Sequence, residues 1–244
     1  MPTVRLEIEY DGGGFRGWAR QPGLRTVQGE LETALATVLR EKVDLTVAGR
    51  TDTGVHARGQ VASFETPAEV PADLARSLNG LGPDDVGVTA AAVVADGFDA
   101  RRDARSRTYR YRLLARRAPN PFEQGRALWW PHSVDHEALD ACAAALAGTH
   151  DFTAFTPTQT DHVRFDRDIL SASWQQESEH ILSFEITADA FMRNMVRALV
   201  GTQLEVASGR RTPASFAQLL DGAPRSAGGD TAPPHGLYLE SVSY

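Results

Sequence analysis

An octet that begins with glycine, residues 49–56, constrains the fold of this chain more than any other segment. The run before it alternates apolar side chains at Val43, Leu45 and Val47, and a second strand-like run follows at residues 60–64. Alternation with a period of two is typical of half-buried strands. The octet also holds a second glycine, and glycines permit backbone conformations that other residues avoid. The pattern predicts a tight loop between two strands.

The octet carries one carboxylate among other reactive or binding side chains. Asp52 has Arg50 two residues before it and His56 four residues after it. Loops that hold such groups on a rigid scaffold often bind ligands or catalyse reactions. An aspartate in a tight turn can also simply hydrogen-bond its own backbone. The octet by itself leaves both interpretations open.

Strand-like and helix-like patterns are mixed in both halves of the chain. This mixture predicts an α+β architecture of two related halves, residues 1–104 and 105–244. We expect a loop at residues 222–234, which is rich in glycine and proline and should be mobile. The expected strands are residues 4–10, 43–47, 60–64, 86–88, 91–94, 107–113, 182–186 and 237–244, and the expected helices are residues 27–39, 71–78, 135–147, 191–207 and 213–220.

Arginines are concentrated in one segment of a chain whose formal net charge is −7. Residues 101–117 contain eight arginines, opposed only by Asp103, and Lys42 is the only lysine in the chain. Guanidinium groups grip phosphates, so the segment is typical of a nucleic-acid-binding surface. A solvated face whose arginines pair with surface acids is the alternative. The eight are Arg101, Arg102, Arg105, Arg107, Arg110, Arg112, Arg116 and Arg117.

Two further features could contribute to a site. Arg197 lies in the apolar helix expected at residues 191–207, and a buried guanidinium needs an anionic partner. Asp52 is one candidate; a side chain that reaches solvent or pairs with Glu205 is the alternative. Tyr109 and Tyr111 share one face of an arginine-rich strand. They are either core residues or a platform on which a base stacks.

Several classes of site are not supported by the sequence. The single cysteine, Cys142, excludes an intramolecular disulfide and a cysteine-based metal cluster. The seven histidines show no metal-ligand spacing, so we expect no metal. The phosphate-binding and dinucleotide-binding glycine motifs are absent from the sequence. No apolar run is long enough to span a membrane and no signal peptide is evident, so we expect a cytoplasmic protein.

Motifs along nearly the whole chain resemble those of the tRNA pseudouridine synthase A family, in the same order. The octet resembles the family's catalytic motif, with Thr53 where alanine is usual. The other motifs are Glu9-Tyr10-Asp11-Gly12, Phe15-x-Gly17-Trp18, Gln21-Pro22, Arg25-Thr26-Val27-Gln28-Gly29-Glu30-Leu31-Glu32, Ser77-Leu78-Asn79, Phe98-Asp99-Ala100-Arg101, Tyr109-Arg110-Tyr111, His150-Asp151-Phe152, Phe191-x-x-x-Met195-Val196-Arg197 and Gly236-Leu237-Tyr238-Leu239.

The resemblance implies a fold and an activity. The fold would be that of pseudouridine synthases: two α/β halves with antiparallel or mixed sheets joined in a continuous sheet, helices on one side and a central basic cleft. The activity would be conversion of uridine to pseudouridine at nucleotides 38, 39 and 40 of the tRNA anticodon stem-loop. A homodimer that binds tRNA and needs neither cofactor nor metal is also implied.

The resemblance assigns roles to single residues. Asp52 would be the catalytic carboxylate, acting as nucleophile or base. Tyr109 would stack on the target base and relay its C5 proton, and Arg197 would form an ion pair with Asp52. The candidate substrate-binding residues, including arginines of the 101–117 segment, are Arg50, His56, Tyr109, Arg101, Arg107 and Arg110.

Two other functions use the same features. A non-catalytic RNA-binding protein would need only the arginine segment, so replacement of Asp52 would leave its affinity for tRNA unchanged. An N-glycosidic hydrolase would use the same carboxylate but would release free uracil. The absence from the sequence of an obvious second catalytic acid near Asp52 argues against hydrolysis.

Overall fold

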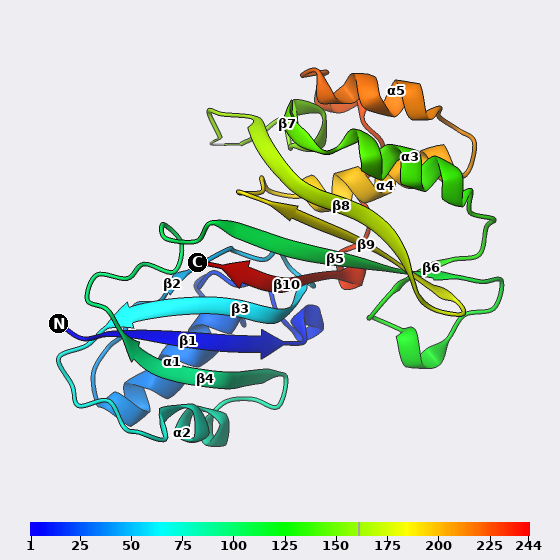
Figure 1. Ribbon diagram of the computed structural model, residues 1–244. Helices are drawn as coiled ribbons and strands as arrows, with labels where there is room; N and C mark the ends of the chain where they lie inside the picture. The colour runs from blue at the N-terminus through cyan, green and yellow to red at the C-terminus, as the bar shows by residue number, and fades with distance from the viewer. Residues whose placement is uncertain (161) are drawn as a thin grey trace. The chain divides into compact units, whose positions relative to one another are not determined.

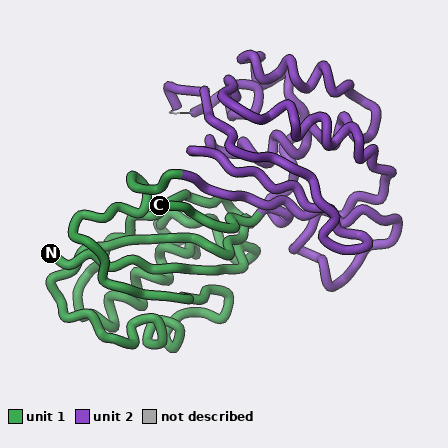
Figure 2. Tube along the Cα trace, in the orientation of Figure 1, with its two compact units in different colours: residues 1–105, 238–244 green, residues 106–237 purple. Residues whose placement is uncertain are grey.

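The structure is a computed structural model, of which residues 1–160 and 162–244 are described. The chain forms two compact units, shown in different colours in Figure 2. Unit 1 contains residues 1–105 and 238–244, and unit 2 contains residues 106–237. Each unit combines β-strands with helices, which confirms the expected α+β class with two α/β parts.

Unit 1 is built on a mixed sheet whose strands follow the order β4-β1-β3-β10. β1 is antiparallel to both β3 and β4, whereas β10 is parallel to β3 and pairs with its residues 56–57. The short β2 is antiparallel to β3 and pairs with its residues 62–63. Helix α2 packs against β4 and beside α1 (Figure 1). The strands are β1 (Thr3–Tyr10), β2 (Thr46–Val47), β3 (His56–Glu65), β4 (Val86–Val94) and β10 (Leu237–Ser243), and the helices are α1 (Val27–Leu39) and α2 (Leu74–Leu81).

Alternation in β1 sets the core of unit 1. Val4, Leu6 and Ile8 are all buried and share one face of the strand. Thr26 caps α1, because its hydroxyl accepts a hydrogen bond from the Gly29 N–H at 3.2 Å. Helix α1 therefore begins at Val27 and ends at Leu39, the bounds expected from the sequence.

Unit 2 is built on strands in the order β5-β9-β8-β7, each antiparallel to its neighbour, with β6 parallel to β5. Its three helices pack on one another, with α3 against β8 and α4 against β5 (Figure 1). The strands are β5 (Ser106–Ala115), β6 (Leu128–Trp130), β7 (Gly148–Asp151), β8 (Asp166–Ser178) and β9 (Ile181–Ala188), and the helices are α3 (His136–Ala145), α4 (Met195–Ala207) and α5 (Pro213–Ala217).

Helix α4 begins later than the sequence pattern indicates. We expected it near residue 191, but it starts at Met195. Asn194 has a left-handed backbone with φ of 60°, which a right-handed helix cannot include. As expected, the helix is buried on most sides.

The segment at residues 222–234, expected to be a mobile loop, is tied to α4. The Ala232 N–H donates to the Arg197 carbonyl at 3.0 Å, and the Gly229 N–H donates to the Thr202 hydroxyl at 3.0 Å. Backbone bonded in this way is part of the packed structure, so the expected mobility does not follow from the composition.

The last strand belongs to the unit that contains the octet. In β10, Tyr238 and Leu239 pair with His56 and Ala57 of β3. The division proposed from the sequence placed this strand with residues 105–244, whereas residues 238–244 belong to the same compact unit as residues 1–105. No helix among the described residues is long and apolar enough to cross a membrane.

Candidate functional site

The first strand positions the middle of the octet. The Thr51 hydroxyl lies 2.7 Å from the Tyr10 hydroxyl, and the Thr51 carbonyl accepts a hydrogen bond from the Trp18 N–H at 3.0 Å. Tyr10 and Thr51 are both buried, with 5% and 6% of their surfaces exposed. Burial raises the pKa of Tyr10 to about 12, although its hydrogen bonds to Thr51 and Gln60 act in the opposite direction.

Gln60 of β3 holds the start of the octet. Its side-chain Nε2 donates to the Gly49 carbonyl at 2.7 Å and to the Tyr10 hydroxyl at 3.3 Å. Gln60 is fully buried, so these bonds do not compete with water.

Asp52 begins a tight turn. Its carbonyl accepts a hydrogen bond from the Val55 N–H at 3.1 Å. Gly54 has φ of 78°, the left-handed conformation required at the third position of a type II turn. Thr53, which stands where the family usually has alanine, is exposed in this turn, so its hydroxyl displaces no core atom.

The end of the octet is held by the loop after β1. The Gly12 N–H donates to His56 Nδ1 at 3.1 Å, and Asp11 Oδ1 lies at the same distance from that nitrogen. When the proton of a neutral His56 ring is on Nε2, Nδ1 can accept the hydrogen bond from the Gly12 N–H. A proton on Nδ1 would instead be donated to the Asp11 carboxylate. The His56 ring also stacks on Tyr238 at a centroid distance of 4.6 Å.

Two glycines outside the octet allow the backbone to approach it. A Cβ atom on Gly12 would lie 1.9 Å from the Val55 carbonyl oxygen, and one on Gly17 would lie 2.9 Å from the Thr51 carbonyl oxygen. Gly17 also has φ of 88°. Both positions therefore require glycine.

In unit 2, the tyrosines of β5 both face the core side of the strand. Tyr109 is buried and meets the Phe191 ring edge-on at 5.0 Å. Tyr111 is fully buried and its hydroxyl donates to the Pro233 carbonyl at 2.8 Å. Burial raises the pKa of Tyr111, and the positive charge of Arg197 opposes that shift.

Arg197 is half-buried on the first turn of α4. Its Nε donates to the Ala232 carbonyl at 2.7 Å, and one terminal nitrogen donates to the Asn194 side chain at 2.9 Å. These two neutral acceptors fix the plane of the guanidinium. Glu205, the alternative partner considered from the sequence, instead lies 3.2 Å from Arg211.

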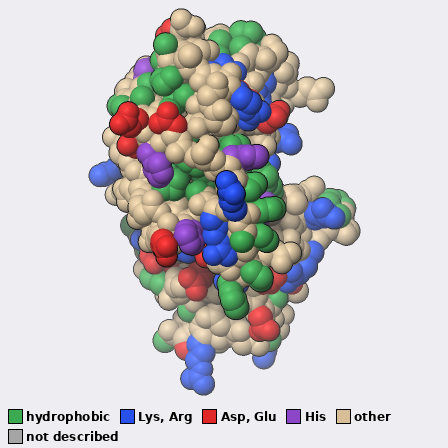
Figure 3. All heavy atoms as spheres, turned by 90° about the vertical axis from the view of Figure 1, so that its right-hand side faces the viewer, with side chains coloured by type: hydrophobic (Ala, Val, Ile, Leu, Met, Phe, Trp, Pro, Cys, Tyr) green, Lys and Arg blue, Asp and Glu red, His purple; other side chains and the backbone are tan. Residues whose placement is uncertain are grey.

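In the arginine-rich segment at residues 101–117, some arginine side chains pair with acidic side chains of the protein and others are exposed to solvent. Arg112 binds Glu123 and Glu177, with its nearest contacts to them at 2.6 and 2.9 Å, and Arg110 lies 3.1 Å from Glu185. The alternative of arginines paired with nearby acids therefore holds for these two. On the face seen in Figure 3, basic side chains are interspersed with acidic and apolar ones.

The other predicted substrate-binding arginines are placed differently. Arg107 is buried and donates to the Asp189 carbonyl at 2.8 Å. Arg50 and Arg101 are exposed.

The predicted site residues thus fall into two groups. Arg50, Asp52 and His56 belong to unit 1, and Tyr109 and Arg197 belong to unit 2. The ion pair between Asp52 and Arg197, like the basic cleft, stays a prediction. The sequence did not indicate Tyr10 and Gln60 as contacts of the octet; the available signals were the family motif that contains Tyr10 and the strand-like run that begins at Gln60.

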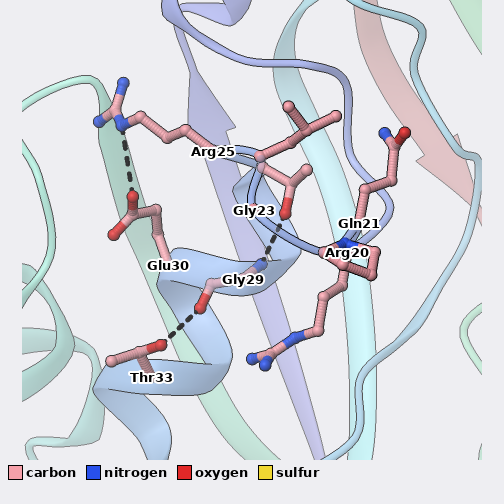
Figure 4. A pocket seen from close by; sticks show the side chains of 10 residues that line it. Arg20, Gln21, Gly23, Arg25, Gly29, Glu30 and Thr33 are labelled. Carbon is pink, nitrogen blue, oxygen red and sulfur yellow. Dashed lines mark hydrogen bonds and ion pairs between the residues drawn. The ribbon is translucent and has the colours of Figure 1, made fainter.

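A pocket of about 540 Å³ lies beside the start of α1 rather than at the octet (Figure 4). Its two arginines are already paired with carboxylates. Arg25 binds Asp85 at 2.8 Å, and Arg20 binds the buried Glu32 at 2.7 Å. Within the described residues, no three His, Cys, Asp or Glu side chains are grouped so that they could hold a metal ion.

The chain is similar to known tRNA pseudouridine synthases. A family model described as tRNA pseudouridine synthase matches residues 142–244. The chain is 44% identical over 249 residues to tRNA pseudouridine synthase A of Streptomyces griseus, a match that covers 99% of this chain and 87% of that protein. It is 40% identical over 244 residues to tRNA pseudouridine synthase A of Bacillus pumilus, covering 99% of this chain and 98% of that protein.

The similarity to solved structures is lower. A crystal structure of a Cbf5-Nop10-Gar1 complex matches with a TM-score of 0.37 and 9% identity, over 83% of this chain and 54% of that one.

Proposed function

Because the chain belongs to the tRNA pseudouridine synthase A family, we propose that it isomerises uridine to pseudouridine at nucleotides 38, 39 and 40 in the anticodon stem-loop of tRNA. The observation that carries this proposal is the similarity to such enzymes over nearly the full chain, which includes the octet around Asp52. The choice of these three nucleotides rests on the family resemblance.

The reaction explains why an aspartate occupies the octet. The bond between N1 and C1′ of the uridine breaks, the uracil turns, and C5 bonds to C1′. Asp52 acts either as a nucleophile at C1′ or as a base at C2′. In both routes N1 gains a proton and C5 loses one. When C5 bonds to C1′, Asp52 either leaves C1′ or returns the proton that it took from C2′, so atoms and charges balance and no oxidant is required.

The base must leave its stack before it can react. Flipping a nucleotide out costs a few kcal/mol, which contacts with the protein must offset. Tyr109 stacks on the flipped base and relays the C5 proton, while Arg197 pairs with Asp52 and keeps it ionised. The remaining substrate contacts are assigned to Arg50, His56, Arg101, Arg107 and Arg110, which would grip phosphates and flank the nucleotide. The protein would act as a cytoplasmic homodimer.

The proposal is tested by mapping pseudouridine in unmodified tRNA after incubation with the purified protein. Wild-type protein should modify nucleotides 38–40, and Asp52→Asn should abolish the reaction while it leaves the unfolding temperature and tRNA binding nearly unchanged. The amide is close in size to the carboxylate but is neither a nucleophile nor a base. Activity of the Asn variant would contradict the proposed role, and free uracil among the products would indicate hydrolysis instead.

A further inference from the structure

We propose that Tyr10 is a positioning residue which, together with Gln60, holds the octet so that Asp52 can react. This inference rests on the proposed function, because it concerns the same carboxylate. Tyr10 lies on β1, away from the octet in sequence, and it is linked to Asp52 through Thr51.

Thr51 transmits the constraint because both its side chain and its carbonyl are bonded. The hydroxyl is 2.7 Å from the Tyr10 hydroxyl and the carbonyl accepts from the Trp18 N–H at 3.0 Å. These two bonds fix the plane of the peptide that leads into Asp52. On the other side, the Val55 N–H bonds to the Asp52 carbonyl at 3.1 Å. The backbone is therefore hydrogen-bonded on both sides of the Asp52 side chain.

Gln60 links Tyr10 to the start of the octet. Its Nε2 donates to the Tyr10 oxygen at 3.3 Å, and the Tyr10 and Thr51 hydroxyls share a second hydrogen bond in which either can be the donor. The same amide nitrogen donates to the Gly49 carbonyl at 2.7 Å, so the bonds of Gln60 and Tyr10 together fix two points of the octet. Tyr10 keeps its proton at all ordinary pH values, because burial raises its pKa to about 12.

The consequence concerns the rate rather than substrate affinity. A reacting group displaced by about 1 Å can lose roughly 100-fold in rate. Tyr10 is buried beneath the octet, so its removal should leave the surface that meets RNA unchanged. Loss of the Tyr10 hydroxyl should therefore lower kcat and leave KM for tRNA nearly constant.

The test is a double-mutant cycle with Tyr10→Phe and Thr51→Val. Each single variant should lower kcat by about 10–100-fold, because a displacement of the reacting group of up to about 1 Å costs up to roughly 100-fold in rate. The double variant should be no slower than the slower single variant, because both changes break the same bond. Thr51→Ser keeps the hydroxyl and should retain most of the activity.

Tyr244→Phe is the matched control. It also removes a tyrosine hydroxyl in unit 1, one that donates to the Ala100 carbonyl at 2.7 Å, and it should keep full activity. Wild-type kcat in Tyr10→Phe, a change confined to KM, or losses that multiply in the double variant would each overturn the inference.

Amide hydrogen exchange tests the same inference without any measurement of activity. In Tyr10→Phe, the amides of Trp18 and Val55 should exchange at least about tenfold faster, because they bond to Thr51 and Asp52. The amides between β1 and β3, for example around the Leu6–Ala62 pair, should not change. The inference would be contradicted if the amides of Trp18 and Val55 exchanged no faster in Tyr10→Phe, or if exchange became equally faster throughout the sheet. Failure of the proposed function would instead appear as a wild-type protein that forms no pseudouridine.

Discussion

At the scale of single residues, the octet is held by buried polar side chains. Tyr10, Gln60 and Thr51 are each almost completely buried, where a polar group without a partner would cost on the order of 1–3 kcal/mol. All three have partners within the octet or next to it. The observed arrangement of the loop satisfies all three, so another arrangement would have to offer equivalent partners or leave a buried polar group unpaired.

Tyr109 offers a residue-scale prediction that separates its two proposed roles. Tyr109→Phe keeps an aromatic ring against Phe191 and should leave tRNA binding nearly unchanged. If the hydroxyl relays the C5 proton, product formation should fall by about 100-fold or more. Rates of tritium release from C5-labelled uridine in tRNA measure this step. Release at the wild-type rate would limit Tyr109 to stacking.

At the scale of elements, two helical glycines should respond oppositely to alanine. A Cβ atom on Gly80, in α2, would meet no other atom within 4 Å, so Gly80→Ala should stabilise the protein by about 0.5–1 kcal/mol through helix propensity. In α4, a Cβ atom on Gly201 would lie 1.8 Å from the Asp230 carbonyl oxygen.

Gly201→Ala should therefore destabilise by at least about 2 kcal/mol, because backbone must move to make room. Urea unfolding of the two variants against wild type measures both changes. Stabilisation by alanine at both sites would show that the segment at residues 222–234 yields easily and does not pack tightly against α4.

Particular elements show what the sequence could predict. The cap at Thr26 and the alternation of β1 and β5 depend on neighbouring residues alone, so they were readable from the sequence. Strand β8 was missed, because most of its side chains are exposed or half-buried and its sequence lacks clear alternation. The start of α4 was placed too early, because the left-handed conformation of Asn194 has no apolar pattern to mark it.

The same distinction applies to the candidate site, where residues could be identified from the sequence but their contacts could not. Asp52, Tyr109 and Arg197 were identified through motifs, which name residues without their contacts. The bonds from Tyr10 and Gln60 to the octet join residues 41 and 11 positions apart, so no local pattern contains them. Such contacts depend on which strands pair.

At the scale of the whole molecule, the buried tyrosines predict how stability depends on pH. Below pH 10, the ordinary pKa, Tyr10 is protonated in both the folded and the unfolded chain, so its contribution is fully present. Between pH 10 and about 12 the unfolded chain loses the proton while the folded chain keeps it. The free energy of unfolding should then fall by about 1.4 kcal/mol per pH unit from this residue alone.

The pKa of Tyr111 is also raised by burial, so it acts with the same sign. Urea unfolding at several pH values between about 9.5 and 11.5 should show a steep loss of stability in the wild type. Tyr10→Phe should show a shallower loss over the same interval, because it lacks the ionisable hydroxyl. Equal slopes in the two proteins would mean that Tyr10 ionises as readily in the folded state as in the unfolded one.

The position of β10 has a consequence for biosynthesis. Residues 1–105 leave the ribosome before unit 2 does. The parallel partner of β3 is β10, and the stacking partner of His56 is Tyr238, so both come from residues that follow unit 2. Chains emerge at about 5–20 residues per second, so the edge of β3 beside the octet stays open for seconds while unit 2 is made. A nascent chain of this protein cannot complete the support of His56 until the final strand has left the ribosome.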